Sequence, residues 1–178
     1  IAFFIFNAIT TYWVYHATLF GAIAAFLVNA TLMAIAFYLF HKIKSATTAR
    51  LGYLAFIVFW ISMEYLHLNW DLSWPWLTYG FSLSNWVKLI QWYSYTGALG
   101  GTAWLLIVNL FVFFVYKSWK LKEDSFFIIK KGIQLGLVVF VPILISLFQY
   151  YTYEEKGFEQ DVVVLQPNMN PYSDRFMD

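Results

Sequence analysis

The sequence predicts an all-α integral membrane protein, in which a bundle of helices crosses the bilayer. Composition is the first observation: 61% of the 178 residues are hydrophobic and 12% are charged, against about 25% charged residues in soluble domains. Aromatic residues are the second, because at 23% of the chain they bring more apolar surface than one small core can bury. The third is that residues 1–40 contain no Asp, Glu, Lys or Arg, a length that only a membrane or a deep core accommodates.

The same composition excludes several other classes. Disordered chains are polar and poor in aromatic residues, and a net charge of +1 without a basic stripe argues against nucleic-acid binding. Cysteine is absent, which excludes disulfides and cysteine nucleophiles within these residues. No histidine pair has a third ligand at metal spacing, so no metal site is expected. The chain opens inside an apolar run at Ile1 without an initiator Met, and we interpret it as an internal piece of a longer protein.

About five spans are expected in a polytopic membrane domain of residues 1–152. A single helix over residues 1–40 would be about 60 Å long, twice the hydrocarbon thickness, so the chain should fold back near residues 16–21. Basic segments at residues 41–50 and 117–131 separate the later apolar runs. The expected spans are 1–15 (short and truncated), 22–40, 51–66, 97–116 and 132–151.

The basic segments also predict the orientation. Residues 41–50 hold three, and residues 117–131 hold five, of the eleven Lys and Arg. Short loops rich in these residues stay in the cytoplasm. The turn near residue 16, the segment 67–96 and everything after Tyr151 should then lie on the opposite face. In a bacterial cell this is a multi-pass protein of the inner membrane with a periplasmic tail.

Segment 67–96 is unusually rich in tryptophan, with five of the nine Trp of the chain. Indole rings settle at the headgroup level of a bilayer. Pro75 and Gly80 prevent one continuous helix, so we expect short helices in the outer interface. Two interpretations remain open: an aromatic belt that only anchors the protein, or a wall that admits a lipid chain to a site above the membrane.

Two polar residues at the end of the third span form a possible polar site. Glu64 and His67 are three residues apart, share a helix face and could pair. An acid close to the membrane is a functional candidate, although at an interface it can also be a solvated carboxylate. Asn29, inside the second span, is expected to hydrogen-bond to a neighbouring helix rather than to bind a substrate.

The composition changes after residue 152. Residues 153–160 read as a charged linker. The run of residues 161–168 is β-branched and ends in turn residues, which predicts a buried strand. One strand cannot stand alone, so residues 161–178 are interpreted as the truncated start of a further domain that lies mostly downstream.

Two groups of motifs carry a resemblance to a known family. The first group has the order Trp60…Glu64, Ser73-Trp74-Pro75-Trp76-Leu77, Gly80, Gln91, Gly97, Gly100 and Asn109. It resembles the membrane domain of the apolipoprotein N-acyltransferase family. The second group is Val164-Leu165-Gln166-Pro167-Asn168 followed by Asp174-Arg175-Phe176. It is similar to the first β-strand of that family's α/β nitrilase-like (carbon–nitrogen hydrolase) domain, although the family usually has Lys-Trp in place of Arg175-Phe176.

The resemblance implies an acyltransferase that uses no cofactor. A Cys thiolate takes an acyl chain from a phospholipid as a thioester and passes it to the N-terminal diacylglyceryl-cysteine of a lipoprotein. The family's catalytic Glu, Lys and Cys lie downstream, so no catalytic residue is assigned in this chain, which is expected to be inactive alone. The residues assigned to the lipid-access wall are Trp70, Trp74, Pro75 and Trp76.

Two alternatives remain. One is another membrane enzyme fused to a carbon–nitrogen hydrolase domain that uses a different acceptor. The other is a transporter or scaffold without chemistry, although the chain shows no internal repeat and its span interiors lack charge. A downstream domain with Glu, Lys and Cys would favour acyl transfer, and an acceptor assay would then separate the two enzymes.

Overall fold

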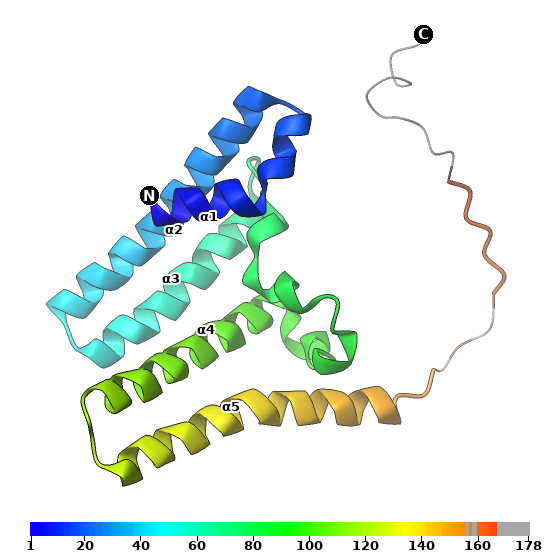
Figure 1. The fold of residues 1–178 in the computed structure, drawn as a ribbon. Helices are drawn as coiled ribbons and strands as arrows, with labels where there is room; N and C mark the ends of the chain where they lie inside the picture. Colours follow the sequence, from blue (N-terminus) through cyan, green and yellow to red (C-terminus); the bar gives the residue numbers. More distant parts are fainter. Residues whose placement is uncertain (156, 158–159, 167–178) are drawn as a thin grey trace.

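The computed structural model describes residues 1–155, 157 and 160–166, and all the regular structure in them is helical (Figure 1). Four helices are long and apolar enough to cross a membrane. They form two antiparallel pairs, α2 with α3 and α4 with α5 (Figure 1). Their bounds are Leu19–Ala46 for α2, Ala49–Asn69 for α3, Tyr93–Lys120 for α4 and Ser125–Thr152 for α5. The prediction of a helical membrane protein is confirmed.

The first predicted span differs from the structure. Residues 1–15 fold as the nine-residue helix α1, Ala2–Thr10, and the 3₁₀ helix η1, Tyr12–His16. Nine helical residues reach about 14 Å, less than half the hydrocarbon thickness. The helix ends at Thr10, because Thr11 has non-helical backbone angles (φ −123°, ψ 23°); the Thr11 hydroxyl and N–H both donate to the Asn7 carbonyl, at 2.7 and 2.9 Å. The described residues thus contain four helices long enough to cross a membrane, and the truncated first span stays a prediction.

The two basic turns are shorter than predicted, because the helices continue into them. Only residues 47–48 separate α2 from α3, and residues 121–124 separate α4 from α5. The Thr48 hydroxyl accepts from Leu51 N at 3.3 Å, and the Asp124 carboxylate accepts from Phe126 N at 2.8 Å. These caps satisfy helix N–H groups. Lysine and arginine favour helices, and their long side chains reach the interface from helical positions.

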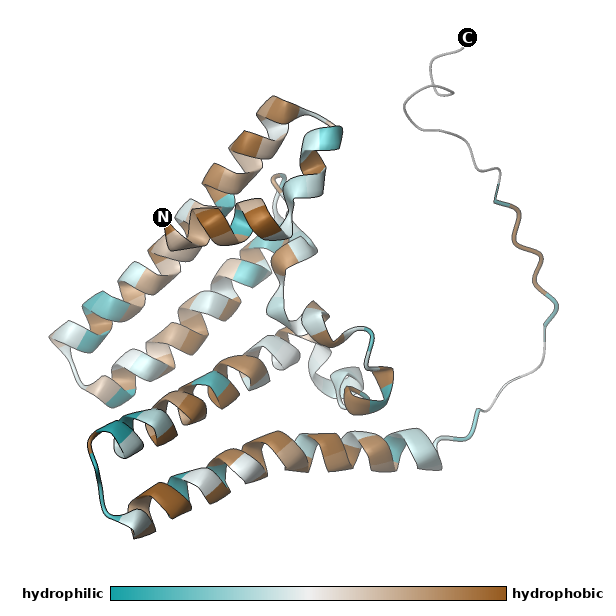
Figure 2. Cartoon of the chain, in the orientation of Figure 1, coloured by the Kyte–Doolittle hydropathy of each residue, from teal (hydrophilic) through white to brown (hydrophobic). Residues whose placement is uncertain are grey.

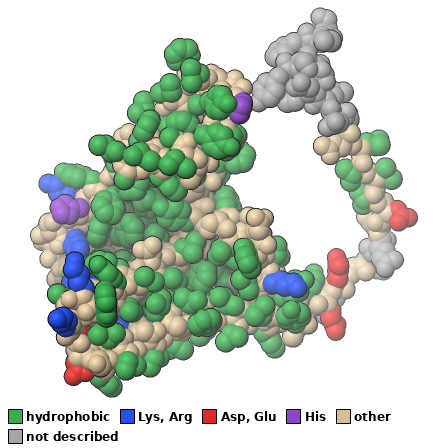
Figure 3. Space-filling view, viewed as in Figure 1, with side chains coloured by type: hydrophobic (Ala, Val, Ile, Leu, Met, Phe, Trp, Pro, Cys, Tyr) green, Lys and Arg blue, Asp and Glu red, His purple; other side chains and the backbone are tan. Residues whose placement is uncertain are grey.

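The two ends of the bundle differ in chemistry. Both basic turns lie at one end, where Figure 3 shows the Lys and Arg side chains gathered. Residues 70–92 and the C-terminal end of α5 lie at the other end (Figure 1). Residues 70–92 contain three short 3₁₀ helices, η2 (Pro75–Leu77), η3 (Tyr79–Leu83) and η4 (Val87–Leu89). This agrees with the short helices predicted for the tryptophan-rich segment.

The buried core is small. Its buried apolar side chains come from α2, α3 and α4: Met33, Ala36, Trp60, Met63 and Leu106. Most other large apolar side chains face outward, and much of α5 is brown in Figure 2. Phe140 and Phe148 of α5 are 62% and 70% exposed. Such an apolar exterior suits lipid rather than water as the surrounding medium.

The predicted strand after the linker stays a prediction. Residues 160–166 are described as exposed chain without secondary structure. Residues 167–178, which include Arg175 and Phe176, lie outside the described residues.

Candidate functional site

One end of α3 is predicted to lie away from the cytoplasm, and this end carries a buried face with polar groups. Trp60, Glu64 and His67 are 2%, 2% and 6% exposed. Their spacing of four and three residues places them on one side of the helix. Glu64 and His67 nevertheless face different surroundings, which divide the site into two parts.

The Glu64 carboxylate joins three elements. One oxygen, Oε1, accepts from Trp60 Nε1 at 3.2 Å and from the Tyr79 backbone N–H at 2.9 Å. The other, Oε2, accepts from the Thr102 hydroxyl at 2.5 Å. Glu64 is therefore not the solvated carboxylate considered from the sequence, and His67 is not among its hydrogen-bond partners within the described residues.

A second layer of contacts extends this arrangement. Thr102 Oγ1 also accepts from the Gly80 N–H at 2.9 Å, and the Tyr93 hydroxyl donates to the Gly80 carbonyl at 3.0 Å. A Cβ at Gly80 would overlap the Ala98 carbonyl oxygen, so only glycine lets η3 approach α4 this closely. We call Glu64, Tyr79, Gly80 and Thr102 the Glu64 latch, since together they hold η3 against α3 and α4.

The Tyr79 side chain adds an aromatic contact to the Glu64 latch. Its ring packs on Trp60 with the centroids 5.0 Å apart. Burial raises the pKa of the Tyr79 hydroxyl to about 12, and the nearby Glu64 carboxylate adds to that rise. The phenol is therefore neutral at physiological pH.

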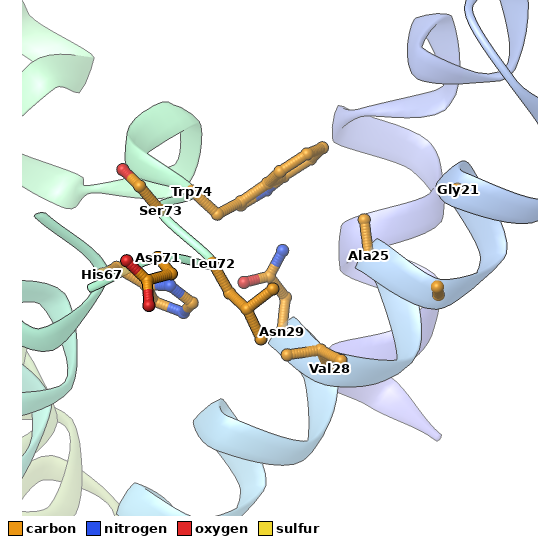
Figure 4. Close-up of a pocket in the computed structure, with 10 residues that line it drawn as sticks. Gly21, Ala25, Val28, Asn29, His67, Asp71, Leu72, Ser73 and Trp74 are labelled. Carbon is orange, nitrogen blue, oxygen red and sulfur yellow. The ribbon is translucent and has the colours of Figure 1, made fainter.

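A cavity of about 280 Å³ lies beside His67, between α2, the end of α3 and the turn at residues 71–74 (Figure 4). Its apolar wall comes mainly from small residues of α2. Its polar groups come from all three elements. The lining residues are Gly21, Ala24, Ala25, Val28, Asn29, His67, Asp71, Leu72, Ser73 and Trp74.

Two polar atoms beside this cavity have no partner among the described residues. His67 Nδ1 and Trp74 Nε1 are buried and make no hydrogen bond there. Asn29, only 3% exposed, presents its amide to the cavity (Figure 4). An unpaired buried polar group costs about 1–3 kcal/mol. The cavity wall thus holds polar groups whose hydrogen-bonding capacity is unused within the described residues.

The four residues assigned to the lipid-access wall lie in different surroundings in the structure. Trp74 lines the cavity, and Trp70 packs edge-on against His67 with the ring centroids 5.5 Å apart. Trp76 is 61% exposed and packs against Trp13, whereas Pro75 begins η2. Of the four, only Trp74 lines the cavity.

Sequence reasoning missed that Asn29 lines the cavity and that Thr102 bonds Glu64. Asn29 makes no interhelical hydrogen bond within the described residues, contrary to expectation, and lines the cavity instead. A polar residue one turn after the small residues Gly21, Ala24 and Ala25 was the available signal. Thr102 carried no signal of its own, because threonine is common in membrane helices.

The far side of the tryptophan-rich segment is tied to α5. The Trp92 N–H donates to Ser146 Oγ at 3.4 Å, and the Lys88 ammonium lies 5.0 Å from the Tyr150 ring centroid. Residues 70–92 therefore bridge from α3 to the end of α5. The chain leaves the bundle from that end (Figure 1).

The described residues offer few of the groups that catalysis commonly uses. Within the described ranges, no group of three or more His, Asp or Glu residues could hold a metal ion, and the sequence offers no cysteine nucleophile. The site combines a positioning network with a partly polar cavity.

Comparison with known proteins gives a consistent result. The family described as apolipoprotein N-acyltransferase N-terminal domain matches residues 1–111. A protein named apolipoprotein N-acyltransferase, from Chlorobaculum tepidum, is 27% identical over 172 residues, which cover 94% of this chain and 31% of the relative. The chain thus spans about a third of the length of that relative. No solved structure gives a significant match.

Proposed function

The chain belongs to the apolipoprotein N-acyltransferase N-terminal domain family, and on this premise we propose that it is the membrane domain of a phospholipid-dependent acyltransferase. The acceptor would be the N-terminal diacylglyceryl-cysteine of a lipoprotein. The four apolar helices hold the enzyme in the bacterial inner membrane, and residues 70–92 present the lipid donor to a nitrilase-like domain that follows in the chain.

The proposed chemistry takes two steps. A Cys thiolate from the following domain attacks an ester carbonyl of the phospholipid, and the lysophospholipid leaves with a proton as the thioester forms. The α-amine of the acceptor then attacks the thioester, so that an amide forms and the thiol is released. Covalent catalysis divides one difficult transfer into two easier ones, and a Glu base with a Lys would activate the thiol.

One observation carries this proposal: the tryptophan-rich segment and the end of α5 lie at the end of the bundle opposite the basic turns (Figures 1 and 3), and residues 71–74 of that segment line the cavity. By the positive-inside rule the basic turns face the cytoplasm. A catalytic domain attached after α5 would then stand in the periplasm, directly above the segment that meets the outer leaflet.

The Glu64 latch and the lipid-access wall would have different roles in presenting the lipid. The latch fixes η3 against α3 and α4, while Trp70, Trp74, Pro75 and Trp76 shape the entry of the lipid. Trp74 would face a lipid that has entered, and the exposed Trp76 would meet the bilayer.

Topology is tested by cysteine labelling, for which this chain is suited because it contains no cysteine. Single replacements Lys122→Cys and Glu154→Cys would be exposed to a membrane-impermeant maleimide in intact cells. We expect labelling at position 154 and protection at position 122 until the cells are lysed. Labelling of both positions, or the reverse pattern, would overturn the proposed orientation.

Acyl transfer is tested on the whole polypeptide, including all residues that follow Asp178, in phospholipid vesicles. The acceptor is a peptide with an N-terminal diacylglyceryl-cysteine, and the control acceptor lacks the diacylglyceryl group. We expect N-acylation of the first peptide only, and none by residues 1–178 alone. Transfer to the control peptide would support a different acceptor, and absence of transfer to both would contradict the enzyme.

A further inference from the structure

We propose that the cavity between α2, the end of α3 and residues 71–74 binds the glycerol ester group of a membrane phospholipid. We call it the ester cavity. Its ligand would place an ester carbonyl against Trp74 Nε1 and the Asn29 amide, with an acyl chain running along α2. The inference deepens the proposed function, on which it rests in taking this lipid for the acyl donor.

The polar groups define the ligand chemistry. Indole Nε1–H can only donate, and in Trp74 this donor is buried without a partner among the described residues. The Asn29 amide adds a second donor at the same cavity, and His67 contributes a ring nitrogen that is likewise unpaired there. A ligand that pairs with Trp74 must therefore bring an acceptor oxygen.

The charges select an ester over a phosphate. No Lys or Arg is among the residues that line the ester cavity, whereas the Asp71 carboxylate is. An anionic phosphate would meet a negative group with no counter-charge, and it would lose its hydration. A neutral ester carbonyl accepts from Trp74 and Asn29 at no such cost.

The surroundings select a lipid over a water-soluble ester. Val28 and Leu72 both line the ester cavity and are also 39% and 63% exposed. Because α2 is a membrane span, an acyl chain can lie on this surface while its ester reaches the cavity.

The volume fits part of a lipid and not all of it. A cavity of about 280 Å³ is at the small end of small-molecule pockets. It can take the glycerol ester region, with the headgroup and the chains remaining outside. Gly21, Ala24 and Ala25 keep the α2 side open, since larger side chains there would fill it.

The test uses the chain in vesicles with a trace of diester phosphatidylcholine that carries a diazirine next to one ester carbonyl. The matrix lipid is either diester or diether phosphatidylcholine, which share a headgroup. Diether lipid lacks carbonyls and should compete poorly for the ester cavity. We expect light-induced labelling of residues 21–29 and 71–74 to be about tenfold higher in the diether matrix, the change that one or two hydrogen bonds provide.

Matched variants identify the groups responsible. Trp74→Phe keeps an aromatic ring but removes one of the two donors, and it should clearly reduce the difference between the two matrices. Trp119→Phe, an exposed Trp at the end of α4, should retain it. Ala25→Phe should reduce labelling by filling the ester cavity, whereas Ala34→Phe, at an exposed position of α2, should not.

The outcomes are separable from those of the proposed function, because labelling requires no turnover. Equal labelling in both matrices, or a Trp74→Phe variant that behaves like Trp119→Phe, would overturn the ester cavity. Competition by soluble glycerol phosphate and not by diacylglycerol would show phosphate recognition and would also overturn it. Ester-selective labelling without acyl transfer by the whole polypeptide would support the ester cavity and contradict the enzyme.

Discussion

Glu64 and His67 lie one turn apart on the same buried face of α3, yet their surroundings are opposite. Every oxygen of Glu64 accepts a hydrogen bond, and its donors come from α3, η3 and α4. His67 Nδ1 is buried with no partner in the part of the chain that the structure describes. A satisfied network fixes structure, whereas an unsatisfied one leaves binding capacity. We therefore assign positioning to the Glu64 latch and ligand binding to the ester cavity.

Breaking the Glu64 latch should cause the largest loss of folding stability. Glu64→Ala removes the acceptor for three buried donors, those of Trp60, Tyr79 and Thr102. At about 1–3 kcal/mol for each stranded donor, partly relieved by relaxation, we expect a loss of about 4 kcal/mol in the free energy of unfolding. Unfolding of the chain in detergent micelles, followed by circular dichroism, measures this loss.

Two controls accompany that variant. Glu64→Gln keeps the shape and one acceptor oxygen, so it should lose less stability than Glu64→Ala. Glu155→Ala removes an exposed acid beyond α5 and should leave the unfolding transition unchanged. A Glu64→Ala protein as stable as the Glu155→Ala protein would show that the carboxylate does not position η3.

The close approach of Gly80 to α4 gives the second-largest expected loss of stability. Gly80→Ala places a Cβ against the Ala98 carbonyl oxygen, so either η3 or α4 must move. Overpacking of this kind costs about 1–3 kcal/mol, and the lost bond from Gly80 N–H to Thr102 adds to it, so we expect about 3 kcal/mol in the same unfolding measurement.

The matched glycine is Gly136 of α5, where a Cβ meets nothing within 4 Å. Gly136→Ala should be neutral or stabilising by up to about 1 kcal/mol, since alanine favours helices. Equal destabilisation by the two substitutions would mean that helix propensity rather than close approach governs position 80.

The sequence predicts best those parts of the fold whose causes act locally along the chain. Hydropathy and basic segments predict α2 to α5, because lipid burial acts on each helix by itself. The same approach treats residues 1–15 as one short segment, whereas the structure divides them into α1 and η1. Pro75 and Gly80 correctly predicted an interrupted segment.

The site was less predictable, because its contacts join distant positions. Glu64 reaches partners 15 and 38 residues away, and no spacing rule on one helix reveals them. Trp74 and Trp76 look alike in sequence, yet the start of η2 at Pro75 turns one to the cavity and leaves the other 61% exposed.

A smaller expected effect is the loss of folding stability at high pH, when the Tyr79 hydroxyl in the Glu64 latch ionises. The pKa of Tyr79 rises from its ordinary value of 10.0 to about 12 in the folded chain, so the folded state holds this proton more tightly than the unfolded state. The corresponding stability is fully present below pH 10 and is lost as the pH rises to about 12. We expect a loss of about 1 kcal/mol after allowing for partial solvent exposure.

Tyr79→Phe isolates that contribution, because phenylalanine keeps the ring on Trp60 and has no proton to lose. The difference in unfolding free energy between wild type and variant should narrow or reverse over this pH range. Tyr65→Phe, at a position 59% exposed, serves as the control. A difference that stays constant with pH would contradict the Tyr79 assignment.

The smallest effect on stability is also the sharpest test of the comparison. His67→Leu replaces an unpaired ring nitrogen with an apolar side chain beside an apolar wall. Removing an unsatisfied polar group can be neutral or stabilising, so we expect a change within about 1 kcal/mol, in contrast to Glu64→Ala one turn away. The same variant should weaken ester-selective lipid labelling of residues 21–29, since the ester cavity loses a polar wall. If His67→Leu destabilised the chain as strongly as Glu64→Ala and left labelling unchanged, His67 would belong with the positioning residues, and the division between the Glu64 latch and the ester cavity would fail.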